Sequence, residues 1–231
     1  MNIEIQIHGV LDGGQTYWKN NDIDFYGSFY VTDNTRPESQ FVVQISPRGR
    51  EGFSCYYTYL ISSKVSAPSG RGGSYFGLTV RLDGHIYNDA YFLYSTLDNL
   101  FRRLILGKVL KSRQEGGYQY LCESFASVED VLLSIEKSII GVAQSNWSAA
   151  DIVPIPLNWQ YVGKSITDNI FDSRGSKISE ALLKGLMVVL SPYYLSQQSR
   201  AISKQMAELK EQSAKEIKNR LEQFDRQLKQ E

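Results

Sequence analysis

The first part of the chain alternates apolar and polar residues with a period of two. Ile3, Ile5 and Ile7 alternate with polar residues, which is typical of a strand with one buried face. Further runs rich in aromatic and β-branched residues follow, separated by turn formers such as Asp33-Asn34. These runs cover residues 25–32, 41–45, 53–61 and 75–82. The pattern predicts an antiparallel sheet.

The hydrophobic period then changes to three and four residues. Leucines and isoleucines from Leu93 to Ile105 predict a helix of roughly twenty residues, with Asn88 or Asp89 as its N-cap. A short strand over residues 118–125 and a second helix follow. We expect this second helix to open at Ser127, with the side chains of Ser127 and Asp130 capping each other's backbone amides. Its expected buried residues are Val131, Leu132, Ile135, Ile139 and Val142. Helices packed on a mostly antiparallel sheet give an α+β domain over residues 1–150.

Three further segments complete the predicted organisation. Residues 151–175 contain two prolines and several isolated aromatic residues, so we expect an extended connector. Residues 176–195 are expected to hold a buried helix, because the run from Ile178 to Leu190 is apolar on most sides. Residues 196–231 predict a charged amphipathic helix for assembly, similar to a coiled-coil helix.

The stripe of this terminal helix is formed by apolar residues and one serine. They are Ile202, Met206, Leu209, Ser213, Ile217, Leu221, Phe224 and Leu228. The average step is about 3.7 residues, which is closer to an 11-residue repeat than to a heptad and favours a short bundle or a docked helix. Acid-first pairs such as Glu211 with Lys215 keep the outer face polar. Self-association or docking on another subunit is the favoured interpretation, and folding back on its own domain is the alternative.

Composition and charge narrow the class of protein. The chain has 231 residues, of which 42% are hydrophobic and 22% charged, enough for one substantial core. Lys plus Arg and Asp plus Glu both number 25, so the net charge favours neither nucleic acid nor an anionic membrane. The N-terminus lacks the pattern of a secretory signal, and the run ending at Leu190 is too short to span a bilayer. We therefore expect a soluble, cytoplasmic protein without a cofactor and without a nucleic-acid or membrane partner.

Groups with catalytic potential are few. Cys55 and Cys122 lie in apolar or aromatic strand contexts, where a small buried hydrophobic residue is the usual role, and a reactive thiol needs an accessible, electropositive setting. No pair of cysteines or histidines has the local spacing of metal ligands, so no metal site is expected. His8, near the end of the first strand, is a better functional candidate than His85.

A glycine-rich loop is the most distinctive local motif. Its candidate ligand-binding residues, together with His8, are Gly70, Arg71, Gly72, Gly73 and Ser74. Successive backbone amides in such a loop can form an anion-binding concavity, and Arg71 can add a bidentate contact. The loop matches neither a Walker A nor a dinucleotide-binding pattern. A hairpin turn with a solvated arginine is the alternative, because glycine is the usual residue of tight turns.

Two segments resemble a known family. Gln6-Ile7-His8-Gly9 followed by Gly13-Gly14-Gln15, and the stretch from Ser69 to Phe76, are similar to the N-terminal domain of GTPase-associated proteins from bacterial conflict systems. The resemblance lies within the first 110 residues. It departs at Gly77, where members often have a histidine after the aromatic pair. It implies an interaction module that works beside a nucleotide-dependent partner in defence against phage, without an established catalytic activity.

These features predict a non-enzymatic protein-interaction adaptor or sensor that assembles through its terminal helix. The expected interface residues are Ile202, Met206, Leu209, Ile217, Leu221, Phe224 and Leu228. The alternative is a cysteine- or anion-dependent hydrolase that uses His8 and the loop around Arg71.

Overall fold

The computed structural model of the chain describes six segments and divides the chain into two compact units. The described residues are 3–18, 40–47, 52–166, 178–190, 207–217 and 220. The first unit is Met1–Pro192 and the second is Tyr193–Glu231. Among the described residues, every buried side chain belongs to the first unit. The hydrophobic core that positions any site is therefore in that unit.

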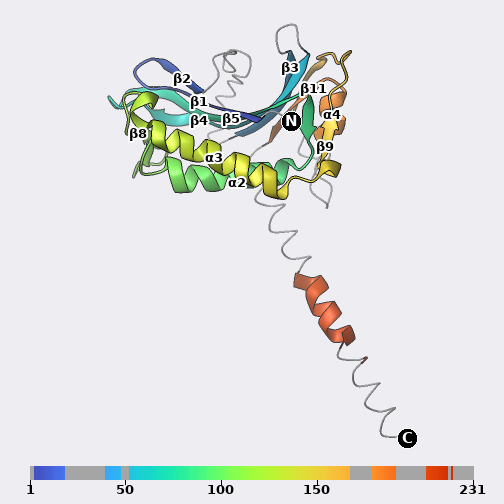
Figure 1. Ribbon diagram of the computed structural model, residues 1–231. Coiled ribbons are helices and arrows are strands. Elements are labelled where there is room, and N and C mark those ends of the chain that lie inside the picture. Colours follow the sequence, from blue (N-terminus) through green and yellow to red (C-terminus); the bar gives the residue numbers. More distant parts are fainter. Residues whose placement is uncertain are drawn as a thin grey trace, which may run out of the picture. The chain divides into compact units, whose positions relative to one another are not determined.

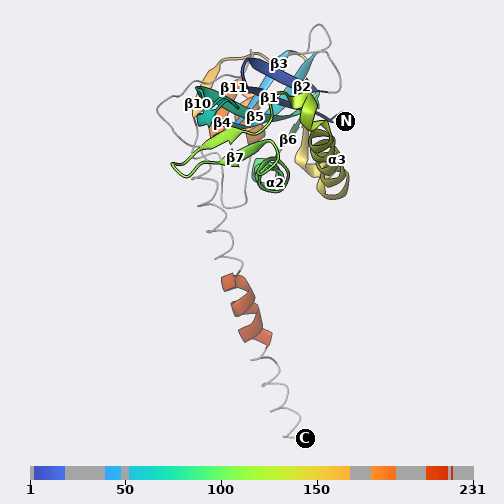
Figure 2. The ribbon, with the colours of Figure 1, turned by 90° about the vertical axis from the view of Figure 1, so that its left-hand side faces the viewer.

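One large sheet forms the centre of the first unit (Figures 1 and 2). Its described strands are β1 (Ile3–Val10), β2 (Gly14–Trp18), β3 (Gln40–Pro47), β4 (Phe53–Ser66), β5 (Gly72–Asp83), β7 (Leu110–Ser112), β8 (Tyr118–Tyr120), β10 (Gly163–Ile166) and β11 (Leu186–Leu190). The main order is β10-β11-β3-β4-β5-β1-β2, and β8 pairs with both β4 and β7. The β10–β11 and β4–β8 pairs are parallel, and the other pairs are antiparallel.

The mostly antiparallel α+β fold is thus confirmed. The predicted runs at 41–45, 53–61 and 75–82 lie within β3, β4 and β5, whereas the run at 25–32 lies outside the described residues. A separate two-stranded antiparallel sheet joins β6 (His85–Tyr87) to β9 (Ile152–Pro154).

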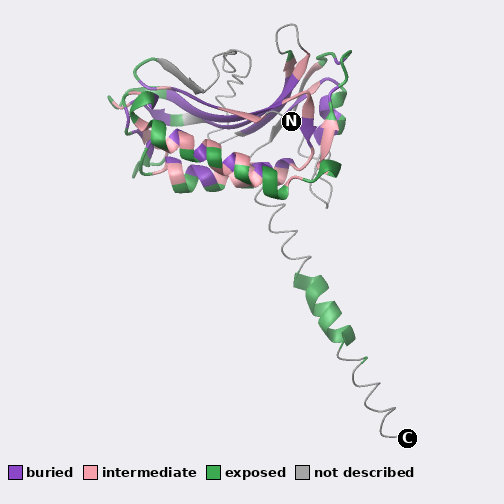
Figure 3. Cartoon of the chain, in the orientation of Figure 1, coloured by how far each residue is buried: buried purple, intermediate pink, exposed green. Residues whose placement is uncertain are grey.

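Helices cover one face of the large sheet. They are α2 (Ala90–Leu100), which continues into the π-helical segment η1 (Phe101–Ile105), and α3 (Glu129–Asn146). Shorter helical segments are η2 (Phe125–Val128), η3 (Ala149–Asp151) and α4 (Ile178–Leu183). Helices α2 and α3 lie side by side in both views (Figures 1 and 2). Their inner sides are buried and their outer sides exposed (Figure 3).

Strand side chains point alternately to the two faces of a sheet, and the side chains that face α2 are apolar and aromatic. Phe41 of β3 and Tyr59 of β4 pack against Tyr94 of α2, with ring centroids 5.7 and 5.9 Å apart. Tyr59 also contacts Phe101 at the start of η1, with centroids 5.4 Å apart. Burial of this apolar surface is the main driving force for folding.

Helix α2 begins as predicted. The carboxylate of Asp89 accepts a hydrogen bond from the amide of Phe92 at 2.8 Å, which satisfies one of the free donors of the first turn. Leu93 and Leu97 are buried, as the three- and four-residue spacing predicted. The predicted stripe of this helix is confirmed.

The predicted cap of α3 is wrong. Ser127 lies inside the 3-10 segment η2, and its hydroxyl donates to the carbonyl of Ser124 at 2.6 Å. Ser124 itself caps η2 by accepting from the amide of Ala126 at 3.2 Å. A 3-10 turn that precedes the α-helix moves the cap three residues earlier than the Ser127–Asp130 spacing suggested. The core residues of α3 are Leu132, Ile135, Ile139 and Ala143.

The predicted buried helix over residues 176–195 is wrong at residues 184–190. Gly185 has a φ of 82°, a left-handed conformation that ends helices. Residues Leu186–Leu190 then form β11, which pairs with β10 and β3. A short apolar run fits a strand buried on both faces as well as a buried helix, and its β-branched Val188 and Val189 favour the strand.

The predicted connector over residues 151–175 contains two strands, β9 and β10, within its described part. Trp159 anchors it: the ring is 6% exposed, and its Nε1 donates to the carbonyl of Leu182 at 2.6 Å. Residues 167–175 lie outside the described residues. No helix in the described part of the chain is long and apolar enough to cross a membrane.

Candidate functional site

The sheet face opposite α2 and α3 carries a polar cluster, which we call the polar face. Strand register places Gln6 and His8 of β1 beside Thr79 and Arg81 of β5, with Thr58 of β4 next to Thr79. Each of the five side chains is at most 1% exposed. Buried polar groups cost free energy unless they are hydrogen-bonded, so this cluster needs a defined network of partners.

His8 lies above Gly77 in this cluster. Its Nε2 is 2.9 Å from the hydroxyl oxygen of Thr79, which is 2.9 Å from that of Thr58. A Cβ on residue 77 would overlap the imidazole, so glycine at this position makes room for the ring. Burial lowers the pKa of His8 to about 3, because the charged imidazolium is desolvated. The imidazole is therefore neutral at pH 7.

Arg81 forms an ionic network on the same face, four residues along β5 from Gly77. Its guanidinium pairs with Glu4, and its Nε lies 3.1 Å from Oδ1 of Asp83. Ser54 donates a hydrogen bond to the same oxygen of Asp83 at 2.9 Å. Loss of one partner of a buried ion pair typically costs about 3–5 kcal/mol, because the other charge stays buried. The network thus holds β1, β4 and β5 in their observed register.

The sheet separates Cys55 from His8. Cys55 lies on the helix-covered face, opposite Leu82 and Ile45 in the strand register, and is fully buried. Burial raises the pKa of its thiol to about 12. Cys122 is also buried, and burial raises the pKa of its thiol. The prediction that both cysteines are buried is confirmed, and Cys55 does not meet the imidazole that a Cys–His nucleophile needs.

The glycine-rich loop is the turn between β4 and β5. Gly70 and Gly73 have φ values of 86° and 87°, which favour glycine. The amide of Ala67 donates to the carbonyl of Arg71 at 2.8 Å, and the amide of Gly70 donates to the carbonyl of Ala67 at 2.9 Å. The exposed residues of the loop include Gly70, Arg71, Gly72 and Gly73, whereas Ser74 is buried. The backbone is that of a closed hairpin turn that presents Arg71 to solvent.

The structure does not bring this loop and His8 into one site. Gly77, over which the imidazole lies, is six residues along the chain from Arg71, roughly 20 Å in an extended strand. The loop instead lies beside the β1–β2 turn. The hydroxyl of Ser69 donates a hydrogen bond at 2.8 Å to the carboxylate of Asp12, which lies in that turn. The β1–β2 turn and the glycine-rich loop are thus neighbours at one end of the sheet.

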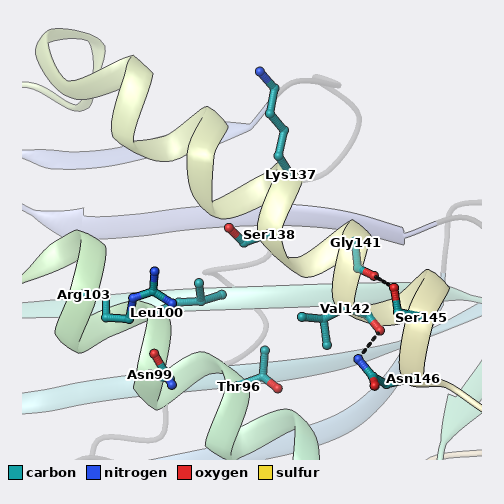
Figure 4. A pocket seen from close by; sticks show the side chains of 10 residues that line it. All are labelled: Thr96, Asn99, Leu100, Arg103, Lys137, Ser138, Gly141, Val142, Ser145 and Asn146. Atoms are coloured by element: carbon teal, nitrogen blue, oxygen red, sulfur yellow. Dashed lines mark hydrogen bonds between the residues drawn. The ribbon is translucent and has the colours of Figure 1, made fainter.

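A groove opens on the outer side of the helix pair (Figure 4). This α2–α3 groove has a volume of about 550 Å³, within the range of ligand sites. Its lining residues are Thr96, Asn99, Leu100, Arg103, Lys137, Ser138, Gly141, Val142, Ser145 and Asn146. None of these described residues is acidic, and two are cationic. Sequence reasoning did not find this groove.

The second unit contains a helix over residues 207–217, and all of its described side chains are exposed. Leu209 and Ile217 of the predicted interface stripe are 58% and 60% exposed. The predicted pair is present: Lys215 Nζ lies 2.8 Å from Glu211 Oε1. The other predicted interface residues, Ile202, Met206, Leu221, Phe224 and Leu228, lie outside the described residues.

Within the described residues, no group of three or more His, Cys, Asp or Glu side chains could hold a metal ion. No protein-family model matches the chain, and no curated protein or solved structure is significantly similar to it. The functional inference therefore rests on the geometry of the chain itself.

Proposed function

We propose that the protein is a non-enzymatic interaction adaptor or sensor whose terminal helix joins it to a second copy or to another protein. The observation that carries this proposal is the exposed apolar stripe of helix 207–217, with Leu209 and Ile217 both more than half exposed. Removing apolar surface from water contributes about 25 cal/mol per Å², so docking of this stripe is favourable. Its stripe is interrupted by Ser213, and most of the stability of a helix in a protein comes from packing of its apolar face, so a docked partner stabilises it.

The charged residues on one side of the same helix indicate that a partner packs only on the opposite, apolar side. Glu211 and Lys215 pair one turn apart and keep that side hydrated, with the alternation of charge typical of helices in bundles. The apolar side is then the face available for a partner. This is the arrangement proposed for a coiled-coil-like or docked helix.

The exposed turns at the end of the sheet are the proposed recognition surface of the first unit. Arg71 projects from a closed hairpin turn and lies near the β1–β2 turn, which Ser69 joins through Asp12. A guanidinium held on an exposed turn suits a carboxylate or phosphate on a protein or a small anionic ligand. In line with the resemblance to GTPase-associated proteins, we propose a nucleotide-dependent partner protein in a bacterial anti-phage system.

Light scattering of the full chain tests assembly through the helix. We expect wild type to have an oligomeric mass at micromolar concentration and the Leu209→Glu variant to have a lower mass, because a charge on the stripe opposes burial. Gln212→Glu adds the same charge to the same helix away from the stripe, and it should retain the wild-type mass. An oligomer that Leu209→Glu leaves intact would contradict assembly through this face. A wild type that is monomeric at all concentrations would exclude self-association and leave only another protein as partner.

A further inference from the structure

Lys64 has a backbone conformation that glycine usually adopts. Its φ is 55°, and no other non-glycine residue of the described chain has a positive φ. It lies at an irregularity of β4, where the pairing with β5 shifts between Ile61 and Val65. Left-handed positions in such bulges are commonly glycine, so backbone stability does not explain a lysine here. The side chain is exposed, and a strained residue of this kind often has a functional role.

The β7–β8 hairpin brings a second cation next to this position, at one end of the large sheet (Figures 1 and 2). Gly117 lies between Arg113 and Lys64. Its carbonyl accepts a hydrogen bond from the amide of Arg113 at 3.0 Å, and a Cβ on it would overlap the carbonyl oxygen of Lys64. The guanidinium of Arg113 is held in place, because its Nη1 donates to the hydroxyl of Ser66 at 2.9 Å.

Strand register adds Lys111 to the same surface. Lys111 of β7 lies opposite Gln119 of β8, which in turn lies beside Ser66 of β4. Residues paired across neighbouring strands lie on the same face of a sheet. The side chain of Lys111 and the guanidinium that reaches Ser66 therefore share one face, with Lys111 and Ser66 about 10 Å apart.

The glycine-rich loop lies at the other side of this row of residues. Ser66 pairs with Gly72, and the side-chain amide of Gln119 donates to the carbonyl of Pro68 at 3.1 Å. Arg71, between Pro68 and Gly72, is therefore at the same end of the sheet. We define the basic corner as the four cations that these contacts bring together, which are Lys64, Arg71, Lys111 and Arg113.

Positive charge predominates in the basic corner, and all four side chains are exposed. Arg113 has one ion pair, in which its Nη2 lies 3.5 Å from Oε2 of Glu115, a side chain that is 86% exposed. Within the described part of the chain the other three cations take part in no ion pair. Asp12, near the loop, accepts a hydrogen bond from Ser69. Like charges on neighbouring strands destabilise a sheet, so an anionic partner would stabilise this grouping.

The aromatic residues of this end favour an acidic protein segment over nucleic acid as that partner. Proteins that bind single-stranded nucleic acid combine cations with aromatic rings on which the bases stack. Here Tyr118 packs edge-on against Phe101, and Tyr120 is 2% exposed with its hydroxyl bonded to the carbonyl of Tyr75. The chain as a whole also has no net charge.

We propose that the basic corner binds an acidic segment of a partner protein. The inference rests on the proposed recognition of an anion at the turn that carries Arg71, and it extends that surface to Lys64, Lys111 and Arg113. Carboxylates of the partner pair with the guanidinium and ammonium groups and compensate the repulsion among them. This contact gives a reason for lysine at position 64, where glycine would suit the backbone.

Substitutions at position 64 separate binding from folding. Binding is measured with the full chain at low ionic strength, by the fluorescence anisotropy of a labelled peptide of alternating Asp and Glu residues. Lys64→Gly should weaken binding about threefold without lowering the thermal midpoint, because glycine accepts the left-handed backbone. Lys64→Arg, which keeps the charge, should retain the wild-type affinity. A thermal midpoint that falls with Lys64→Gly would contradict the backbone argument.

A lysine elsewhere on the same unit provides the matched control. Lys111→Gln should weaken binding of the peptide about threefold, and the combination with Lys64→Gly should weaken it about tenfold. Lys137→Gln removes an exposed lysine of α3 and should leave the affinity unchanged.

Three results would overturn the proposal. Equal affinities of wild type, Lys64→Gly and Lys111→Gln would show that the peptide binds elsewhere. An equal loss with Lys137→Gln would show that the peptide responds only to net charge. If a single-stranded oligonucleotide of the same charge binds more tightly than the peptide and is weakened by the same substitutions, the surface belongs to nucleic acid.

The same assay separates this inference from the proposed function. If Arg71→Gln weakens binding while the substitutions at positions 64 and 111 do not, recognition at the turn stands and its extension falls. If wild type does not bind the peptide, both fall. Assembly through the terminal helix, which light scattering measures, does not depend on either result.

Discussion

The imidazole of His8 occupies the space that a side chain at Gly77 would fill. Strand register sets them side by side, and a methyl group on residue 77 would overlap the imidazole. We predict that Gly77→Ala lowers the free energy of unfolding by about 1–3 kcal/mol, the usual range for overpacking a core. In a His8→Ala background the same change should cost much less, since the ring is gone. Urea unfolding of the four chains measures this coupling, and equal costs in both backgrounds would show that the ring does not lie over residue 77.

The buried imidazole also makes stability depend on pH. Its pKa is about 3 in the folded chain and about 6.5 when unfolded, so the unfolded chain binds a proton that the folded chain excludes. A group whose folded pKa is lowered in this way destabilises the fold as pH falls from about 6.5 toward 3. The limiting slope for one group is about 1.4 kcal/mol per pH unit. Above pH 7 the imidazole is neutral in both states and the effect disappears.

A His8→Asn variant isolates this contribution. Carboxylates titrate in both proteins below pH 5, so the difference between wild type and variant reports on the histidine. We expect the free energy of unfolding of wild type to fall relative to that of His8→Asn as the pH is lowered. Urea titration at pH 5, 6 and 7.5 measures this difference. Parallel pH profiles would show that His8 is accessible to protons in the folded state.

The same residues mark where sequence reasoning reached its limit. Alternation identified β1, but it predicted one buried face, whereas Gln6 and His8 are buried on the other face as well. A polar position has the same pattern whether water or protein covers it, so the pattern cannot distinguish the two. Thr58, Thr79 and Arg81 were missed for that reason. They lie on the same sheet face as Gln6 and His8, and this shared face can be recognised only when the register of β1, β4 and β5 is known.

At the scale of elements, prediction succeeded where a period was long enough to be recognised. Helices α2 and α3 and strands β3, β4 and β5 each repeat their apolar spacing several times and lie where expected. Three-residue strands such as β7 and β9 have no period, and their pairing depends on distant partners. The apolar run around Val188 was ambiguous between helix and strand, and Gly185 with the neighbouring β3 decided it.

The candidate site illustrates the same division between local and tertiary information. The loop around Arg71 was recognisable from its glycines, and the structure shows it as an exposed hairpin turn. The α2–α3 groove was not recognisable, because it exists only where two helices far apart in sequence lie side by side (Figure 4). The lone sequence signal was Gly141, a glycine inside an otherwise regular helical pattern.

At the scale of the whole molecule, the buried core and the helix proposed for assembly belong to different units. The described buried residues extend from Gln6 to Val188, all within the first unit, and the exposed stripe belongs to the second. A chain that lacks residues 200–231 should therefore keep the core intact. We predict that this deletion retains the far-UV circular dichroism of the sheet and the cooperative unfolding of the first unit, while its mass by light scattering is that of a monomer.

Concentration dependence provides the decisive comparison for this deletion. Association stabilises a folded chain by mass action, so the thermal midpoint of an assembling wild type rises with protein concentration. The deleted chain has no stripe to bury, and its midpoint should stay constant over a hundredfold range of concentration. At the lowest concentration, where wild type dissociates, the two midpoints should converge. A deleted chain that melts lower than dissociated wild type would show instead that residues 200–231 stabilise the first unit within one molecule, which is the fold-back alternative.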